Sequence, residues 1–225
     1  MGLYMTPEDH KRVSDAVAAA ESRTAGEIVT VIADRSDGYS DVAFAWAAFA
    51  AFTALAVFAF WPDFVLGKIE WVFGGWNHEW TRRELLGIAT GLAIVKFLGV
   101  WAILLWQPLR FALVPPPIKT ARALGRAIDL FKVGAERRTH GRTGILIYLS
   151  MREHRAEIVA DEAIASKVAS ETWGEAMAAM LPEIAEGRCA DGMIAAVERV
   201  GAVLAEHFPR LEDDRNELPD RLIEL

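Results

Sequence analysis

The sequence predicts an α/β domain, with a small mixed β-sheet between helices, that a two-helix transmembrane hairpin interrupts. Two long apolar runs, residues 42–61 and 85–109, lie in the first half of the chain. Segments rich in β-branched and aliphatic residues, 27–33, 144–150 and 156–160, lie on both sides of these runs. Helical patterns of apolar residues accompany them, so the outer pieces are expected to build one fold around the apolar insert.

The composition already indicates two kinds of segment in one chain. Of the 225 residues, 53% are hydrophobic while 24% are charged, a high apolar share for so charged a domain. Such an apolar content excludes intrinsic disorder. The single cysteine, Cys189, excludes a disulfide scaffold. A net charge of −7 excludes nucleic acid as a main partner, because nucleic acid requires a basic face.

The N-terminal piece, residues 1–41, predicts one helix and one strand. Residues 6–9 (TPED) have the N-cap threonine, first-turn proline and acidic residues that begin a helix. The strand is expected over residues 27–33. One helix and one strand cannot form a stable core, so this piece requires partners from elsewhere in the chain.

The segment 42–109 is predicted to be a transmembrane hairpin. Residues 42–61 contain no charge and no polar stripe, and about 20 such residues cross a bilayer. Residues 85–109 contain one charge, Lys96, and a lysine at mid-span costs a few kcal/mol that the surrounding leucines and isoleucines offset. The stretch 63–84 is expected to be an interfacial connector, with a packed soluble loop as the alternative.

Aromatic and basic residues near the run ends predict the membrane boundaries. Indole rings favour the headgroup layer, which suits Trp61, Trp80 and Trp106, and Arg110 follows the second run. Six basic residues flank the two runs on the outside and three lie between them, so both termini are predicted to be cytoplasmic.

The C-terminal piece, residues 110–208, predicts the rest of the domain, and residues 209–225 are expected to be an acidic tail. A helix follows the prolines 115–117, and further helices are expected over 161–169, 171–186 and 190–207. The long connection between the first two strands favours a parallel pair, and the short turn after the second makes the next pair antiparallel.

Three stretches of the sequence resemble the bacterial membrane-protein branch of the TPM domain family. They are EIVTVIADRSDGYSD, ERRTHGRTGILIYLSMREHRAEIVADEAI and the closing NELPDRLIEL. The resemblance covers both outer pieces, and this branch has a hydrophobic insert at the same place. It implies an α/β sandwich, together with the acid phosphatase activity and calcium binding of relatives in other compartments. The family's acidic cluster does not map onto residues of this chain.

The strand arrangement predicts one group of candidate site residues. Glu27, Asp161 and Glu162 are expected near one edge of the sheet, where carboxylates can bind a divalent cation such as calcium. With Arg142 they could also hold a phosphate ester, which would make Glu27, Asp161 and Arg142 the catalytic candidates. The alternative is structural: Asp161 caps the helix that it begins, and Glu27 pairs with an arginine.

Other charged residues predict less specific chemistry. The acids at 34, 37 and 41 have a spacing that fails the EF-hand pattern, so a solvated loop is expected there. Arg152, His154 and Arg155 are expected in a basic collar beside the bilayer. A charged residue within a membrane span is by default a candidate for function, so Lys96 is one, although snorkelling or an oligomer contact explains it equally well.

From these observations we expect a multi-pass protein of the bacterial cytoplasmic membrane with a non-enzymatic accessory or interaction role. The expected partners are the lipid bilayer and a membrane protein or a second copy of the chain. The first alternative is a calcium-linked, metal-assisted acid phosphatase. The second is a transport component that uses Lys96 in an oligomer.

Overall fold

The computed structural model describes residues 4–73, 79–134, 143–210 and 220–225. The chain divides into two compact units, which we describe separately. Met1–Asp37 and Pro116–Leu225 form the first, here called the α/β unit. Gly38–Pro115 form the second, here called the hairpin unit.

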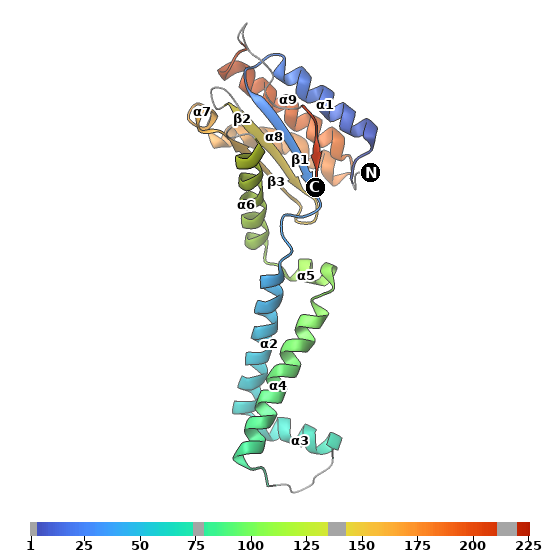
Figure 1. Ribbon diagram of the computed structural model, residues 1–225, viewed down its shortest axis with the longest axis vertical. Helices are drawn as coiled ribbons and strands as arrows, with labels where there is room; N and C mark the ends of the chain where they lie inside the picture. The colour runs from blue at the N-terminus through green and yellow to red at the C-terminus, as the bar shows by residue number, and fades with distance from the viewer. Residues whose placement is uncertain (1–3, 74–78, 135–142, 211–219) are drawn as a thin grey trace. The chain divides into compact units, whose positions relative to one another are not determined.

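The α/β unit contains a mixed four-stranded sheet with the strand order β3-β2-β1-β4 (Figure 1). β1 and β2 are parallel, and β2 and β3 are antiparallel, so the predicted fold class is confirmed. The parallel register joins two segments that are far apart in the sequence. The strands are β1 (Glu27–Ala33), β2 (Gly144–Ser150), β3 (Arg155–Ala160) and β4 (Ile223–Glu224).

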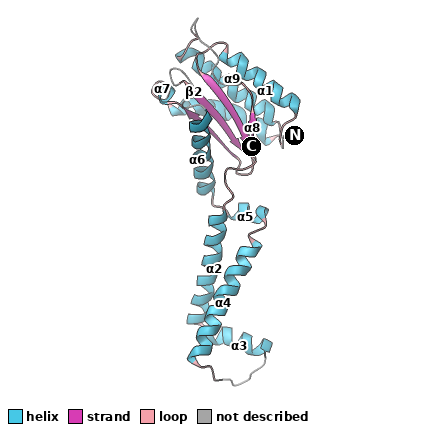
Figure 2. Cartoon of the chain, viewed as in Figure 1, coloured by secondary structure: helices cyan, strands magenta, loops and turns pink. Residues whose placement is uncertain are grey.

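Helices cover both faces of this sheet (Figure 2). Because successive side chains of a strand point to opposite faces, β1 and β2 each contribute to two cores. Ile28 and Ile147 belong to the larger core, with α1 (Pro7–Glu21) and α9 (Cys189–His207). Val31 and Tyr148 belong to the smaller core, under α6 (Pro116–Gly134). The sheet is therefore buried on both sides, which explains why β2 is apolar along most of its length.

Two helices of the larger core are shorter than the sequence predicts. The helix expected over 161–169 is only α7 (Glu162–Ala165), after which Val168 enters the core. The helix expected over 171–186 begins as a 3₁₀ turn, Ser170–Thr172, and continues as α8 (Trp173–Ala185). Side-chain periodicity therefore located these helices but not their ends.

The acidic tail expected over 209–225 is partly wrong, because its last residues form β4. Ile223 pairs in parallel with Val31, and the Leu225 N–H donates to the Ile32 carbonyl at 2.9 Å. Leu222 is buried in the larger core, while Ile223 contacts the smaller one. One apolar side chain on each face is enough to attach a short strand to β1, and a strand of two residues leaves no periodic signal.

The described residues of the hairpin unit, 38–73 and 79–115, form four helices. α2 and α4 pack against each other, and Phe44 of α2 stacks on Phe97 and Trp101 of α4, with centroid distances of 6.4 and 6.2 Å. α4 begins with a capping box between Thr81 and Glu84. The helices are α2 (Ser40–Phe60), α3 (Pro62–Phe73), α4 (Arg82–Ile103) and α5 (Gln107–Leu113).

The second apolar run is not one continuous helix, as the range 85–109 predicted. α4 ends at Ile103, and α5 begins at Gln107. Pro108 explains the break, since proline has no N–H to donate to the Leu104 carbonyl and its ring would clash with that carbonyl in a continuous helix. α2 and α4 are both long and apolar enough to cross a membrane, and no residue of α4 is buried.

Close contact between α1 and α9 yields a stability prediction. A Cβ atom on Gly201 would lie 2.7 Å from the Cβ atom of Ala20, too close without a shift of one helix. Gly201→Val should therefore lower the free energy of unfolding by about 1–3 kcal/mol. The measurement is denaturant unfolding of the full chain in mild detergent.

Gly125 provides the matched control. It lies inside α6, and a Cβ atom added there meets nothing within 4 Å. Gly125→Ala should raise the free energy of unfolding by about 0.5–1 kcal/mol, because alanine loses less backbone entropy in a helix. Equal effects of the two substitutions would contradict the α1–α9 packing.

Candidate functional site

Two of the predicted site residues, Glu27 and Asp161, lie at the edge where β1 and β2 begin. Glu27 pairs in register with Gly144, and its N–H donates to the Thr143 carbonyl at 3.1 Å. The Gly144 N–H donates to Oδ2 of Asp161 at 3.1 Å. Both carboxyl residues are buried, with 6% and 4% of their surface exposed. The structure therefore brings Glu27 and Asp161 to neighbouring strand ends.

Asp161 occupies the N-cap position of α7, as the structural alternative expects, but its side chain does not form the cap. Its side chain makes no capping hydrogen bond to α7, whose first residue is Glu162. Instead, the carboxylate accepts from the first N–H of β2, and the Asp161 N–H donates to the Gly144 carbonyl at 2.9 Å. Asp161 thus joins the end of β3 to the start of β2. Glu162 is exposed, and Arg142 lies outside the described residues.

A third carboxyl group at this edge, Glu21, was missed by the sequence analysis. It is the last residue of α1, and its Oε1 accepts from the Ile28 N–H at 2.6 Å. Burial raises the pKa of Glu21 to about 8, the Ile28 hydrogen bond opposes that rise, and Glu27 and Asp220 add to it. Glu21 follows Val17 by four residues, so its position on the buried helix stripe was a usable signal.

The proposed metal ligands Glu27, Asp161 and Glu162 stay a prediction. Within the described part of the chain, no three histidine, cysteine or acidic side chains are placed to hold one metal ion.

The opposite edge of the sheet holds the loop that leaves β1. Asp34 Oδ1 accepts from the Tyr4 hydroxyl at 2.5 Å and from Nε of Arg152 at 3.0 Å. Burial alone would raise the pKa of Asp34, but these two hydrogen bonds and the arginine charge outweigh it and lower the pKa. Asp37 pairs with Arg122 at 3.2 Å. Asp34 and Asp37 therefore pair with basic side chains, a role that does not require the acid spacing of a calcium-binding EF-hand loop.

A buried polar network fixes this loop to the β2–β3 turn. The Ser36 N–H donates to Glu153 Oε1 at 2.9 Å, and the Ser36 hydroxyl lies 2.9 Å from Oγ of Ser150 and 3.0 Å from the Tyr148 hydroxyl. Ser150 also donates to Glu153. Because Ser150 is fully buried and Glu153 is 2% exposed, a substrate cannot reach this pair. The network holds the fold together.

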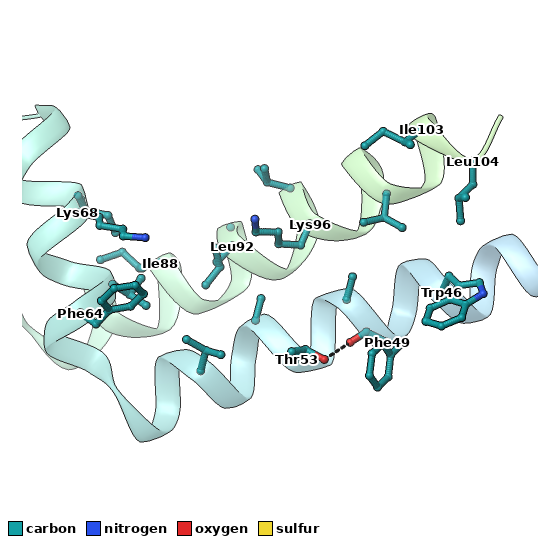
Figure 3. A pocket seen from close by; sticks show the side chains of 18 of the residues that line it. Trp46, Phe49, Thr53, Phe64, Lys68, Ile88, Leu92, Lys96, Ile103 and Leu104 are labelled. Carbon is teal, nitrogen blue, oxygen red and sulfur yellow. Dashed lines mark hydrogen bonds between the residues drawn. The ribbon is translucent and has the colours of Figure 1, made fainter. Parts of the chain in front are cut away.

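The hairpin unit contains an open apolar groove of about 1320 Å³ (Figure 3). Apolar side chains of α2, α3, α4 and α5 line it, together with two lysines, Lys68 and Lys96. The Lys68 ammonium lies 4.1 Å from the centroid of the Phe64 ring. Lys96, the residue that the sequence marked as unusual, therefore shares its surroundings with a second cation that the sequence analysis placed in the connector.

The other predicted membrane residues belong to the same unit. Trp61 and Trp106 are exposed, at 63% and 65%. Trp80 Nε1 donates to Glu70 Oε1 at 3.2 Å. Arg110 lies in α5 and is partly buried. Two exposed indoles at the ends of α2 and α4 suit an interfacial position.

Comparison with known proteins shows what the chain is similar to. Residues 118–203 match the family model described as the TPM domain. The NMR structure of the BA42 protein from the psychrophilic bacterium Bizionia argentinensis superimposes with a TM-score of 0.56. The two chains are 18% identical, and the comparison covers 99% of this chain and 96% of that one, which shows a shared fold. No curated protein matches the chain.

The raised pKa of Glu21 predicts a pH-dependent stability. Since the folded-state pKa of about 8 exceeds the ordinary value of 4.5, folding favours the protonated acid. Its contribution is fully present below pH 4.5 and is lost as the pH rises towards 8, by at most about 1.4 kcal/mol per pH unit. Glu21→Gln should remove this loss, so the variant should gain stability over the wild type between pH 5 and 8.

Denaturant unfolding at several pH values measures this difference. Glu8→Gln is the control, because Glu8 is an exposed residue of the same helix. A difference in unfolding free energy between Glu21→Gln and the wild type that stays constant from pH 5 to 8 would contradict the raised pKa of Glu21.

Proposed function

We propose that this chain carries a TPM domain and that the domain is a non-enzymatic accessory or interaction module that the hairpin unit anchors in the bacterial cytoplasmic membrane. The proposed partners are the bilayer itself and a second membrane protein or another copy of the chain. In this proposal α2 and α4 cross the membrane, and both termini face the cytoplasm.

The exposed apolar surface of α2 and α4 is the main observation that supports the proposed membrane anchor. Their 21 and 22 residues correspond to about 30 Å of helix, the thickness of the hydrocarbon layer. Phe52 is 70% exposed on α2, and Leu86 is 70% exposed on α4. Soluble monomers rarely leave a continuous apolar patch of this extent in water. A core helix of a soluble protein would instead be largely buried.

The polar groups of the α/β unit support a non-enzymatic role. Asp161 binds the first N–H of β2, and Asp34 binds Tyr4 and Arg152. Ser150 and Glu153 are buried in one network. Each of these groups joins separate parts of the fold, which is a sufficient reason for its presence.

A metal-assisted phosphatase is the second candidate. It is favoured by the register that brings Glu27 beside Gly144, the residue that Asp161 contacts. The test is hydrolysis of p-nitrophenyl phosphate by the purified full chain with and without calcium. A calcium-dependent rate that Asp161→Asn abolishes would refute the accessory role and support the phosphatase. A transport role ranks below both, since the lining around Lys96 is almost wholly apolar.

Membrane extraction tests the anchor. We expect the full chain to stay in the membrane pellet after alkaline carbonate washing, because α2 and α4 bury their apolar surface in lipid. Phe52→Arg should reduce this retention, since an arginine at mid-span costs about 2.5–3.5 kcal/mol, whereas Phe52→Leu should not. Release of the wild-type chain by carbonate would contradict the anchor.

Cysteine accessibility tests the orientation. In a Cys189→Ser background, single cysteines replace exposed residues at Arg23, in the α/β unit, and Glu79, in the connector. A membrane-impermeant maleimide added to spheroplasts should label Glu79→Cys and spare Arg23→Cys until the membrane is opened. The reverse pattern would place the domain on the outer side.

A further inference from the structure

We propose that the groove of the hairpin unit binds one anionic phospholipid, with its phosphate between Lys68 and Lys96 and an acyl chain along the apolar lining. This inference rests on the proposed membrane anchor and adds a specific ligand to it. It is carried by the shape of the groove and by the position of its two cations (Figure 3).

The groove suits an acyl chain in length and chemistry. Its α4 side runs from Ile88 to Leu104, which corresponds to about 24 Å along the helix. A lipid chain fills about half of a 30 Å hydrocarbon layer, so the groove can take one chain along its length. Trp46 and Phe49 of α2 contribute aromatic surface to the lining. The Thr53 hydroxyl donates to the Phe49 carbonyl at 2.7 Å, which satisfies this polar group within α2.

The two lysines approach neighbouring parts of the groove. Helical side chains lean towards the N-terminal end of their helix, so Lys96 reaches back towards Leu92. In Figure 3 the Lys96 ammonium lies near the turn of Leu92, and the Lys68 ammonium extends from α3 towards Ile88, one helical turn before Leu92. Both residues line the groove.

An anion at this place would offset the cost of two cations in apolar surroundings. An ammonium group removed from water is unfavourable unless it is paired. Neither Lys68 nor Lys96 forms an ion pair within the described residues. Among the nearest acids in sequence, Glu70 accepts from Trp80, and Glu84 caps α4. The ring of Phe64 stabilises the Lys68 ammonium and leaves its charge uncompensated.

A phospholipid suits these cations better than a second copy of the chain. Residues 42–60 contain no charge, and Lys96 is the single charge between residues 85 and 103. A second copy would therefore bring apolar helix faces to the groove and no carboxylate to the level of Lys96. The bilayer supplies a phosphate and an apolar chain in one molecule, and phosphate is a common ligand of lysine.

The test uses the full chain purified in mild detergent, with phosphatidylglycerol and phosphatidylcholine as the probes and native mass spectrometry as the readout. The wild type should retain phosphatidylglycerol in preference. Lys68→Met and Lys96→Met should each lower that retention about fivefold, and the double variant should approach the level of phosphatidylcholine. Lys132→Met, on an exposed position of α6, is the matched control and should change nothing. Lys96→Arg keeps the charge and should keep the lipid.

Insertion into nanodiscs distinguishes a failure of the lipid site from a failure of the membrane anchor. A chain that inserts but retains phosphatidylglycerol equally with and without Lys68 and Lys96 would refute the lipid site and leave the anchor intact. A chain that inserts into nanodiscs of neither phosphatidylglycerol nor phosphatidylcholine would refute the anchor itself. Loss of a co-purified membrane protein in Lys96→Met, with lipid retention unchanged, would assign the groove to a partner helix and overturn the lipid proposal.

Discussion

The parallel ladder between β1 and β2 is the constraint on which the rest of the structure depends. It pairs Glu27 with Gly144 and Ala33 with Ser150, two segments that the whole hairpin unit separates in sequence. Every other part of the α/β unit uses this ladder: α6 covers one face, α1 and α9 cover the other, and β4 attaches to the free edge of β1. A chain that leaves β1 must therefore return to start β2. In the proposed anchor, two membrane crossings would satisfy that requirement, because they would bring the chain back to its original side.

Polar side chains secure the ladder at both ends. At one end Asp161 binds the first N–H of β2, and Glu21 binds the second residue of β1 through the Ile28 N–H. At the other end Ser36 and Glu153 connect the loop after β1 to the turn after β2. Parallel strands need such contacts, since no tight turn joins them. Asp161, which the sequence marks as a candidate for chemistry, is thus explained first by the fold.

Sequence periodicity predicted the architecture and failed where the structure depends on single residues. The apolar runs and β-branched segments were identifiable because their patterns extend over five or more residues. Helix ends were not, since Pro108 breaks the second run and Val168 turns into the core. β4 was missed because two residues form no pattern. Glu27 and Asp161 lie at one edge as expected, whereas the place of Lys68 in the groove was missed because it depends on how α3 packs.

The central claim is that a complete α/β fold is interrupted by its own anchor. Its most direct test replaces Gly38–Pro115 with a short glycine-serine linker, which the 3.2 Å ion pair between Asp37 and Arg122 shows to be geometrically feasible. The account predicts a soluble protein that retains the mixed sheet by circular dichroism and unfolds cooperatively in denaturant. An unfolded or aggregated product would contradict the self-sufficient fold, and a product that stays in the membrane pellet would contradict the anchor.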